Sequence, residues 1–226
     1  MQTSKATEDS SPMAQVLAKR LLPAVVIEQA DLAIPLCEAL LTAGLNVIEV
    51  TFRTAAAEEA IRNIAQRFPE MVLGAGTLLT VEQVSRARDA GAIFGVAPGL
   101  SDNVLRRAQE CGLAMIPGVV TPTEISRALD LGCRVLKFFP AEASGGVQAL
   151  QALAGAFGHT GVRFVPTGGI DSKNLRDYLA LPTVAAVGGS WMVSRQLIAA
   201  KSWKTIETLA GEAVAAANRE RKPCCS

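Results

Sequence analysis

Lys137 lies in the part of the chain best suited to covalent chemistry. It stands in the sequence VLKFFPAE (residues 135–142), where an apolar, strand-forming run ends in one lysine followed by two aromatic residues and a proline. An apolar pocket disfavours the ammonium form of a lysine, so the free amine becomes available to attack a carbonyl group and form a Schiff base. The alternative is a lysine whose ammonium group simply reaches from a strand end into water. Lys137 is therefore a candidate nucleophile.

Glu49 is a candidate for proton transfer because it interrupts the apolar stretch 46–51. Carboxylates are rarely buried unless they are paired or functional. Side chains alternate along a strand, so Glu49 and Thr51 share a face, and a carboxylate held away from water there could shuttle protons. Arg53 offers a planar guanidinium suited to a substrate carboxylate. An ion pair between Glu49 and Arg53 is the structural alternative.

Two double-glycine turns, at residues 168–169 and 188–189, follow the last two apolar segments of the chain. Glycine lets the backbone approach an anion without a Cβ in the way, and barrel proteins commonly bind phosphate at this pair of loops. Ordinary tight turns are the alternative. Thr77 and Thr167 could add hydroxyl donors nearby, although a single threonine is more often a cap or turn residue. Together the two turns predict a phosphate site.

The elements that must position these residues are short apolar strands separated by amphipathic helical stretches. The predicted strands cover residues 22–27, 46–51, 71–75, 92–96, 114–117, 135–138, 163–166 and 184–187. Such continuous apolar runs are typical of parallel strands buried on both faces. Eight strand-then-helix units predict a single-domain α/β fold, a (β/α)8 TIM barrel, in which the reactive residues gather at the carboxyl ends of the strands. A doubly wound sheet is the alternative, but no Gly-x-Gly-x-x-Gly follows the first strand.

The barrel domain is expected to cover residues 12–218. An extra N-terminal helix at 11–21 is expected to cover the bottom of the barrel, and a helix at 202–218 to complete the outer layer. Residues 1–11 are expected to form a disordered leader and residues 219–226 a disordered tail. Phosphate-binding loops would then lie at the opposite end of the barrel from the extra helix.

Composition excludes several classes of protein. The 226 residues carry a net charge of +1 with acidic and basic residues interspersed, so we expect no nucleic-acid partner. The polar N-terminus has no signal-peptide core and no apolar run reaches membrane-spanning length, which favours a soluble, cytoplasmic protein without a membrane partner. The five cysteines lack zinc-type spacing and His159 is the only histidine, so no metal site is expected.

Six motifs together resemble the KDPG/KHG aldolase family, named for 2-keto-3-deoxy-6-phosphogluconate (KDPG) and 4-hydroxy-2-oxoglutarate (KHG). The motifs are EVTFRT (49–54), GAGT (74–77), PG with TPTE (117–118 and 121–124), KFFPAE (137–142), PTGGI (166–170) and GGSW (188–191). The likeness runs from about residue 14 to 216. It departs little from the family pattern: Phe52 stands where many relatives have leucine, and the leader and the tail fall outside the family core.

The resemblance implies a class I aldolase, a carbon–carbon lyase that cleaves KDPG to pyruvate and D-glyceraldehyde 3-phosphate in the Entner–Doudoroff pathway, and also KHG to pyruvate and glyoxylate. It implies a homotrimer that needs no metal or cofactor. Lys137 resembles the Schiff-base lysine and Glu49 the general acid/base. The implied substrate-binding groups are Arg53, Thr77 and Thr167 for the carboxylate, Gly168, Gly169, Gly189 and Ser190 for the phosphate, Phe139 as an apolar wall beside the imine, and Pro98 in a pocket-lining turn.

Two other functions are compatible with the same residues. A metal-free sugar-phosphate epimerase or isomerase would use Glu49 as a base and Lys137 only electrostatically. A catalytically silent sugar-phosphate-binding protein would keep the glycine turns but typically lose Lys137 or Glu49, and both are present. Within the family, the KFFPAE and PTGGI motifs resemble the gluconate branch more than the galactonate branch. The balance between KDPG and KHG as substrates is left open by the sequence.

Overall fold

A computed structural model describes residues 11–219 of the chain. The strands are β1 (Leu21–Val25), β2 (Val47–Thr51), β3 (Val72–Gly76), β4 (Phe94–Val96), β5 (Ala114–Ile116), β6 (Gly118–Val119), β7 (Val135–Phe138), β8 (Arg163–Pro166) and β9 (Val187–Gly189). The helices are α2 (Pro12–Ala18), α3 (Ala33–Thr42), α4 (Ala57–Arg67), α5 (Val81–Asp89), α6 (Asp102–Glu110), α7 (Pro122–Asp130), α8 (Gly146–Phe157), α9 (Leu175–Leu179), α10 (Arg195–Ala199) and α11 (Trp203–Arg219).

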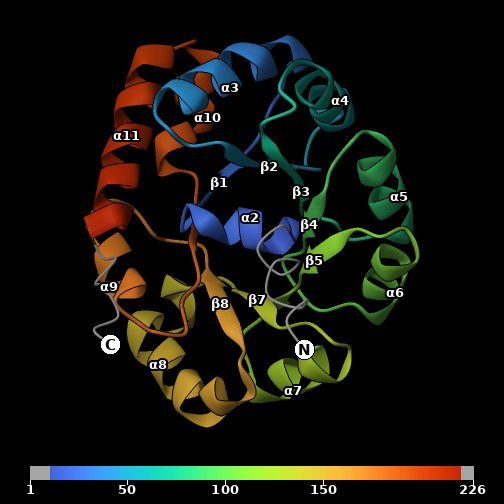
Figure 1. The fold of residues 1–226 in the computed structure, drawn as a ribbon, viewed down its shortest axis with the longest axis vertical. Helices are drawn as coiled ribbons and strands as arrows, with labels where there is room; N and C mark the ends of the chain where they lie inside the picture. The colour runs from blue at the N-terminus through green and yellow to red at the C-terminus, as the bar shows by residue number, and fades with distance from the viewer. Residues whose placement is uncertain (1–10, 220–226) are drawn as a thin grey trace, which may run out of the picture.

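The strands are parallel and form a curled sheet surrounded by helices (Figure 1). Six of them pair in the order β5-β4-β3-β2-β1-β9, and three more in the order β6-β7-β8. Isolated bridges, Phe164 with Val184 and Thr167 with Gly188, connect β8 to the segment that contains β9. The prediction of parallel strands alternating with outer helices is therefore confirmed, and all carboxyl ends of the strands face the same way.

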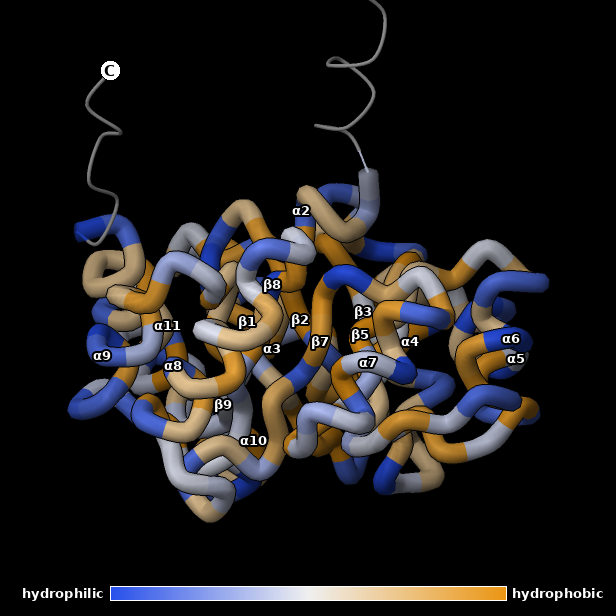
Figure 2. The backbone as a smooth tube through the Cα atoms, turned by 90° about the horizontal axis from the view of Figure 1, so that it is seen from below, coloured by the Kyte–Doolittle hydropathy of each residue, from blue (hydrophilic) through white to orange (hydrophobic). Residues whose placement is uncertain are grey.

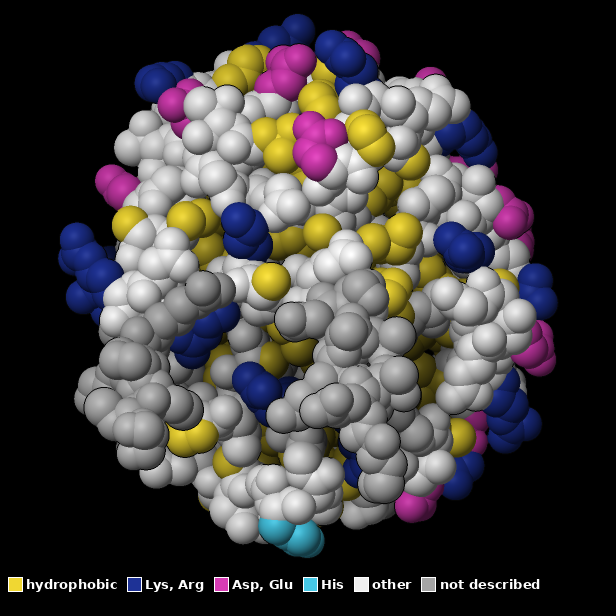
Figure 3. Space-filling model, in the orientation of Figure 1, with side chains coloured by type: hydrophobic (Ala, Val, Ile, Leu, Met, Phe, Trp, Pro, Cys, Tyr) yellow, Lys and Arg dark blue, Asp and Glu magenta, His cyan; other side chains and the backbone are white. Residues whose placement is uncertain are grey.

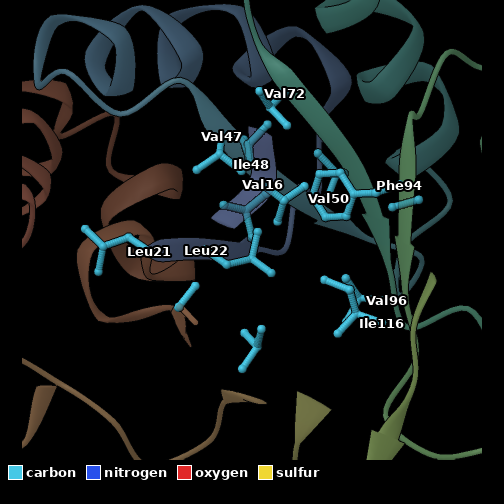
Figure 4. Close-up of a cluster of buried hydrophobic side chains, with 14 of the residues drawn as sticks. Val16, Leu21, Leu22, Val47, Ile48, Val50, Val72, Phe94, Val96 and Ile116 are labelled. Carbon is cyan, nitrogen blue, oxygen red and sulfur yellow. The ribbon is translucent and has the colours of Figure 1, made fainter. Parts of the chain in front are cut away.

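The core fills the inside of the curled sheet and the layer between the strands and the helices. Val16 of α2 is fully buried, and Figure 4 shows it among side chains from the amino-terminal halves of β1 and β2, such as Leu22 and Ile48. Figure 2 shows α2 at one end of the molecule, with the apolar strands running through its interior. The extra N-terminal helix thus covers the amino ends of the strands, as the sequence indicated, and leaves the carboxyl ends for a site.

Most predicted strand boundaries lie within two residues of those observed, and three places need a physical explanation. The strand expected at 114–117 is divided at Pro117, which has no N–H to donate to a ladder, into β5 and β6. The strand expected at 184–187 begins only at Val187, since Val184 donates its backbone N–H to Leu181 in a turn. The N-terminal helix ends at Ala18, and Arg20, with φ of 57°, turns the chain into β1. The leader and tail predicted for 1–11 and 219–226 lie outside the described residues, apart from Ser11 and Arg219 at their borders.

The outer surface carries charges of both signs. On the face drawn in Figure 3, lysines and arginines are interspersed with aspartates and glutamates around the rim. None of the helices described between residues 11 and 219 has the length and apolar character that a membrane crossing requires.

Candidate active site

A cavity of about 200 Å³ opens at the carboxyl ends of the strands. All eleven residues singled out in the sequence line it: Glu49, Arg53, Thr77, Pro98, Lys137, Phe139, Thr167, Gly168, Gly169, Gly189 and Ser190. They come from six separate segments of the chain, and the parallel fold brings these segments to one mouth. Three further lining residues, Ala24, Thr51 and Ile170, were not among the predicted site residues.

Lys137 and Glu49 form a buried pair inside this cavity. Lys137 lies on β7 and Glu49 on β2, which are not neighbours in either sheet, so the two side chains meet across the interior. The Lys137 Nζ is 3.7 Å from Glu49 Oε1, and the side chains are only 8% and 1% exposed. Within residues 11–219 the carboxylate ion-pairs with Lys137 rather than Arg53, and no protein group there donates a hydrogen bond to either of its oxygens. The amine and the carboxylate are thus both available to a bound molecule.

Gly76 makes room for the Glu49 carboxylate. On the neighbouring strand β3, Gly76 is paired in register with Thr51, two residues beyond Glu49. A Cβ at residue 76 would lie 2.0 Å from Glu49 Oε1, closer than any real contact. The GAGT motif therefore allows the observed position of Glu49, because Gly76 has no side chain to occupy the same space.

Beside Glu49, the hydroxyl group of Thr51 connects two neighbouring parts of the cavity lining. The Thr51 hydroxyl donates to the Val25 carbonyl oxygen at 2.8 Å and accepts from Arg53 Nε at 3.2 Å, which places the guanidinium at the edge of the cavity. Thr77, which also lines the cavity, has φ of 57°, a left-handed conformation unusual for threonine. Such conformations concentrate at binding and active sites, where surrounding structure compensates for their cost.

Another part of the cavity lining comes from the end of β7, from β8 and from the loops that follow β8 and β9. The ring of Phe139 has its centroid 5.0 Å from Lys137 Nζ, a cation–π distance. Gly168 and Gly169 both have positive φ, 102° and 80°, which presents their backbone to the cavity. A Cβ at Gly188 would lie 2.2 Å from Thr167 Oγ1, so glycine there allows the two strand ends to approach.

Two of the missed lining residues follow from the strand pattern. Thr51 shares a face with Glu49 by alternation, and Ala24 is the register partner of Glu49 on β1. Ala24 carries no polar group, and the Thr51 hydroxyl is bonded to the Val25 carbonyl oxygen and to Arg53 Nε. Ile170 simply follows the glycine pair. His159 is exposed in a short 3-10 turn and does not line the cavity.

None of the cysteines within residues 11–219 lines this cavity. Cys133 instead lines a different, more apolar cavity of about 290 Å³ with Met13, Leu105 and Met115, near α2 and the amino end of β7. Cys37 lies on α3 and is buried. Cys224 and Cys225 lie outside the described residues.

Comparison with known proteins places this site in a family. The family model of KDPG and KHG aldolase matches residues 13–209. The chain belongs to the KDPG and KHG aldolase family. It is 47% identical over 197 residues to the 2-dehydro-3-deoxy-phosphogluconate aldolase of Dickeya dadantii, covering 87% of this chain and 92% of that protein. It is 46% identical over 194 residues to the KHG/KDPG aldolase of Escherichia coli K12, covering 86% and 90%.

A solved aldolase of the family has the same fold. The crystal structure of KDPG aldolase from Legionella pneumophila, with pyruvate captured at low pH as a covalent carbinolamine intermediate, superposes with a TM-score of 0.85 at 40% identity. The match covers 90% of this chain and 98% of that one. The resemblance read from the six motifs is thereby confirmed at the level of the family.

Proposed function

We propose that this aldolase cleaves KDPG to pyruvate and D-glyceraldehyde 3-phosphate through a Schiff base on Lys137, and also cleaves KHG to pyruvate and glyoxylate. The observation that carries the proposal is the buried pair of Lys137 Nζ and Glu49, 3.7 Å apart in a cavity that two glycine loops border. An amine nucleophile and a proton carrier at this spacing are what imine chemistry requires.

The reaction begins at the amine of Lys137. It attacks the C2 ketone of the substrate to form a carbinolamine, which loses water to give a protonated imine. The C3–C4 bond then breaks, and its electron pair flows into the imine to give an enamine. The C4 end leaves as the aldehyde, which is glyceraldehyde 3-phosphate when the substrate is KDPG. The covalent carbinolamine seen in the Legionella enzyme supports this route.

Glu49 handles the protons in this scheme. Its carboxylate takes the C4 hydroxyl proton as the bond breaks and returns a proton to C3 of the enamine, after which hydrolysis of the imine releases pyruvate. Its burial supports the role, and so do its two oxygens: within residues 11–219 no protein donor occupies the lone pairs that would accept the proton. General acid/base help of this kind contributes about 100- to 10,000-fold to the rate.

The remaining lining residues bind the two charged ends of the substrate. Arg53 provides the charge-assisted partner for the carboxylate, with Thr77 and Thr167 as added hydroxyls from the same cavity lining. The backbone at Gly168–Gly169 and Gly189–Ser190, in the same lining, holds the phosphate. Phe139 excludes water beside the imine, and Pro98 closes the rim.

A lactate dehydrogenase-coupled assay of pyruvate release tests the function. We expect KDPG cleavage by the wild type and a loss of about 100- to 10,000-fold in kcat for Glu49→Gln. Glu59→Gln, an exposed glutamate on α4, is the matched control and should leave kcat unchanged. If no pyruvate were released and the substrate were instead converted to a sugar phosphate of equal mass, the epimerase hypothesis would be favoured.

We also propose that the curled sheet closes into an eight-stranded (β/α)8 barrel, with β5 and β6 acting as one interrupted strand. Only Pro117 separates these two strands, and the bridge between Thr167 and Gly188 lies where the last strand meets β8. A crystal structure with a continuous ladder around all eight positions is the expected result. An open edge between β5 and β7 would contradict it.

We propose a homotrimer as the assembled state. Leu79 and Val81, just beyond β3, are 57% and 43% exposed and are the large apolar side chains most open to water within residues 11–219. Leu79 also borders a groove that includes Pro98 and Leu100, so a neighbouring copy covering this patch would adjoin the active site. Light scattering after size exclusion should give three chain masses for the wild type and one for Leu79→Asp. A wild-type mass of one chain would refute the trimer.

A further inference from the structure

Tyr178, the only tyrosine in the sequence, is fully buried and yet makes a polar contact outside its own helix. It lies on α9, directly after the Gly168–Gly169 loop. Its hydroxyl donates a short hydrogen bond to Glu142 Oε1, 36 residues away in sequence. Burial raises the pKa of Tyr178, and the hydrogen bond with Glu142 raises it further, so the hydroxyl stays a donor at any working pH. Neither residue lines the cavity or takes part in the reaction described above.

Glu142 packs directly against the glycine loop. Its backbone N–H donates to the Gly168 carbonyl oxygen at 3.0 Å, and the preceding N–H, of Ala141, donates to that of Thr167 at 2.8 Å. A Cβ at Gly169 would lie 2.6 Å from both Cβ and Cγ of Glu142. The Glu142 side chain therefore occupies one face of Gly169, and the cavity lies against the loop that this contact shapes.

The loop is held from the helix side as well. Asn174, at the start of α9, donates through Nδ2 to the Gly169 carbonyl oxygen at 3.2 Å. Its Oδ1 accepts from the Asp171 N–H at 2.9 Å. The hydrogen bond from Tyr178 then ties Glu142, on one side of the loop, to α9 on the other. Gly168 and Gly169 are thus clamped between two elements at the positive φ angles they need.

We propose that Glu142 and Tyr178 are positioning residues that hold the Gly168–Gly169 backbone for the substrate phosphate. The inference rests on the proposed function, because it gives the enzyme its preference for a phosphorylated over an unphosphorylated substrate. Since the clamp touches only the phosphate end of the site, it leaves the imine chemistry at Lys137 unaffected. A purely structural role would lower stability and impair both substrates alike.

The clamp is tested by comparing KDPG with KHG, which has no phosphate. Tyr178→Phe keeps the ring and its packing while removing the donor, and Glu142→Ala removes the acceptor. A hydrogen bond to a charged group is strong enough that its loss should raise KM for KDPG about tenfold or more. The kcat for KDPG and the kcat/KM for KHG should stay within about twofold of wild type.

Two further variants separate positioning from general damage. Glu142→Gln retains an acceptor for the tyrosine hydroxyl and should restore a KM near that of wild type. Asp177→Asn, an exposed carboxylate beside Tyr178 on α9, is the matched control and should change nothing. An unchanged KM for KDPG in Tyr178→Phe, or an equal loss on both substrates, would overturn the clamp.

Titration calorimetry with inorganic phosphate makes the inference independent of turnover. Wild type and Asp177→Asn should bind phosphate with the same Kd, and Tyr178→Phe should bind it about tenfold more weakly. Equal affinities in all three proteins, or no phosphate binding by the wild type, would reject the inference. Failure of the wild type to cleave KDPG, with phosphate binding weakened in Tyr178→Phe, would instead reject the proposed function and leave the clamp standing.

Discussion

Replacing Gly76 by alanine should disable the aldolase by displacing Glu49, while every group that reacts keeps its chemical identity. The new Cβ would lie 2.0 Å from Glu49 Oε1, whereas ordinary van der Waals contact starts at 3.4 Å, so the carboxylate must retreat by about 1.4 Å. Gly76 has no positive φ, so the alanine backbone itself is unstrained. A misplacement of about 1 Å in a catalytic group costs roughly 100-fold, and complete loss of the proton carrier costs up to about 10,000-fold. We expect kcat for Gly76→Ala to fall within this range.

Steady-state kinetics and trapping together check this prediction. The coupled assay of pyruvate release gives kcat, and borohydride reduction with pyruvate reports imine formation, which should still be detectable because Lys137 is not displaced. Gly155→Ala on α8, where nothing lies within 4 Å of the added methyl group, is the matched control and should turn over like wild type. Circular dichroism confirms that both variants fold. A folded Gly76→Ala enzyme with kcat within about twofold of wild type would show that the position of Glu49 does not matter.

Two predictions concern stability and thiol chemistry. Hydrogen bonds from Arg86 and Arg62 lower the pKa of Glu58, so its contribution to stability is present above the unfolded-state pKa and lost as the pH falls through the folded-state pKa. Glu58→Gln should therefore lower the free energy of unfolding, measured by urea denaturation, by at most about 1 kcal/mol at pH 7 and by less at pH 3. A decrease of equal size at both pH values would contradict this prediction. Burial raises the pKa of the Cys37 thiol to about 12, with the Glu38 and Glu70 carboxylates adding to it, so iodoacetamide at pH 8 should label Cys37 only after unfolding. Peptide mass mapping of labelled folded protein would reveal any modification that contradicts this.

Most of the fold was readable from the chain because parallel strands and their helices leave local signals. The apolar runs that end at Thr51, Phe138 and Pro166 predicted strands that the structure contains. The division of one strand at Pro117 was not foreseen, although proline has no N–H for a ladder. The delayed start of β9 depends on a turn that the apolar sequence around Val184 does not reveal.

That the site residues lie close together was predicted from the parallel fold, and not from the distances between them in the sequence. Glu49 lies two residues before the end of β2 and Lys137 one residue before the end of β7. In a parallel fold this places both near one mouth, however far apart they are in the sequence. Contacts that depend on packing between distant segments gave no such signal. The hydrogen bond from Tyr178 to Glu142 and the room that Gly76 leaves for Glu49 are of this kind, and only the structure shows them.

The proposed cleavage requires a covalent bond between the substrate and Lys137, and this bond can be trapped chemically. The purified protein is incubated with pyruvate and borohydride, digested, and the site of any added mass is mapped by mass spectrometry. We expect a reduced pyruvyl adduct on the peptide that contains Lys137, and no adduct on Lys137→Ala. An adduct on another lysine, or no adduct on the wild type, would contradict a Schiff base on Lys137.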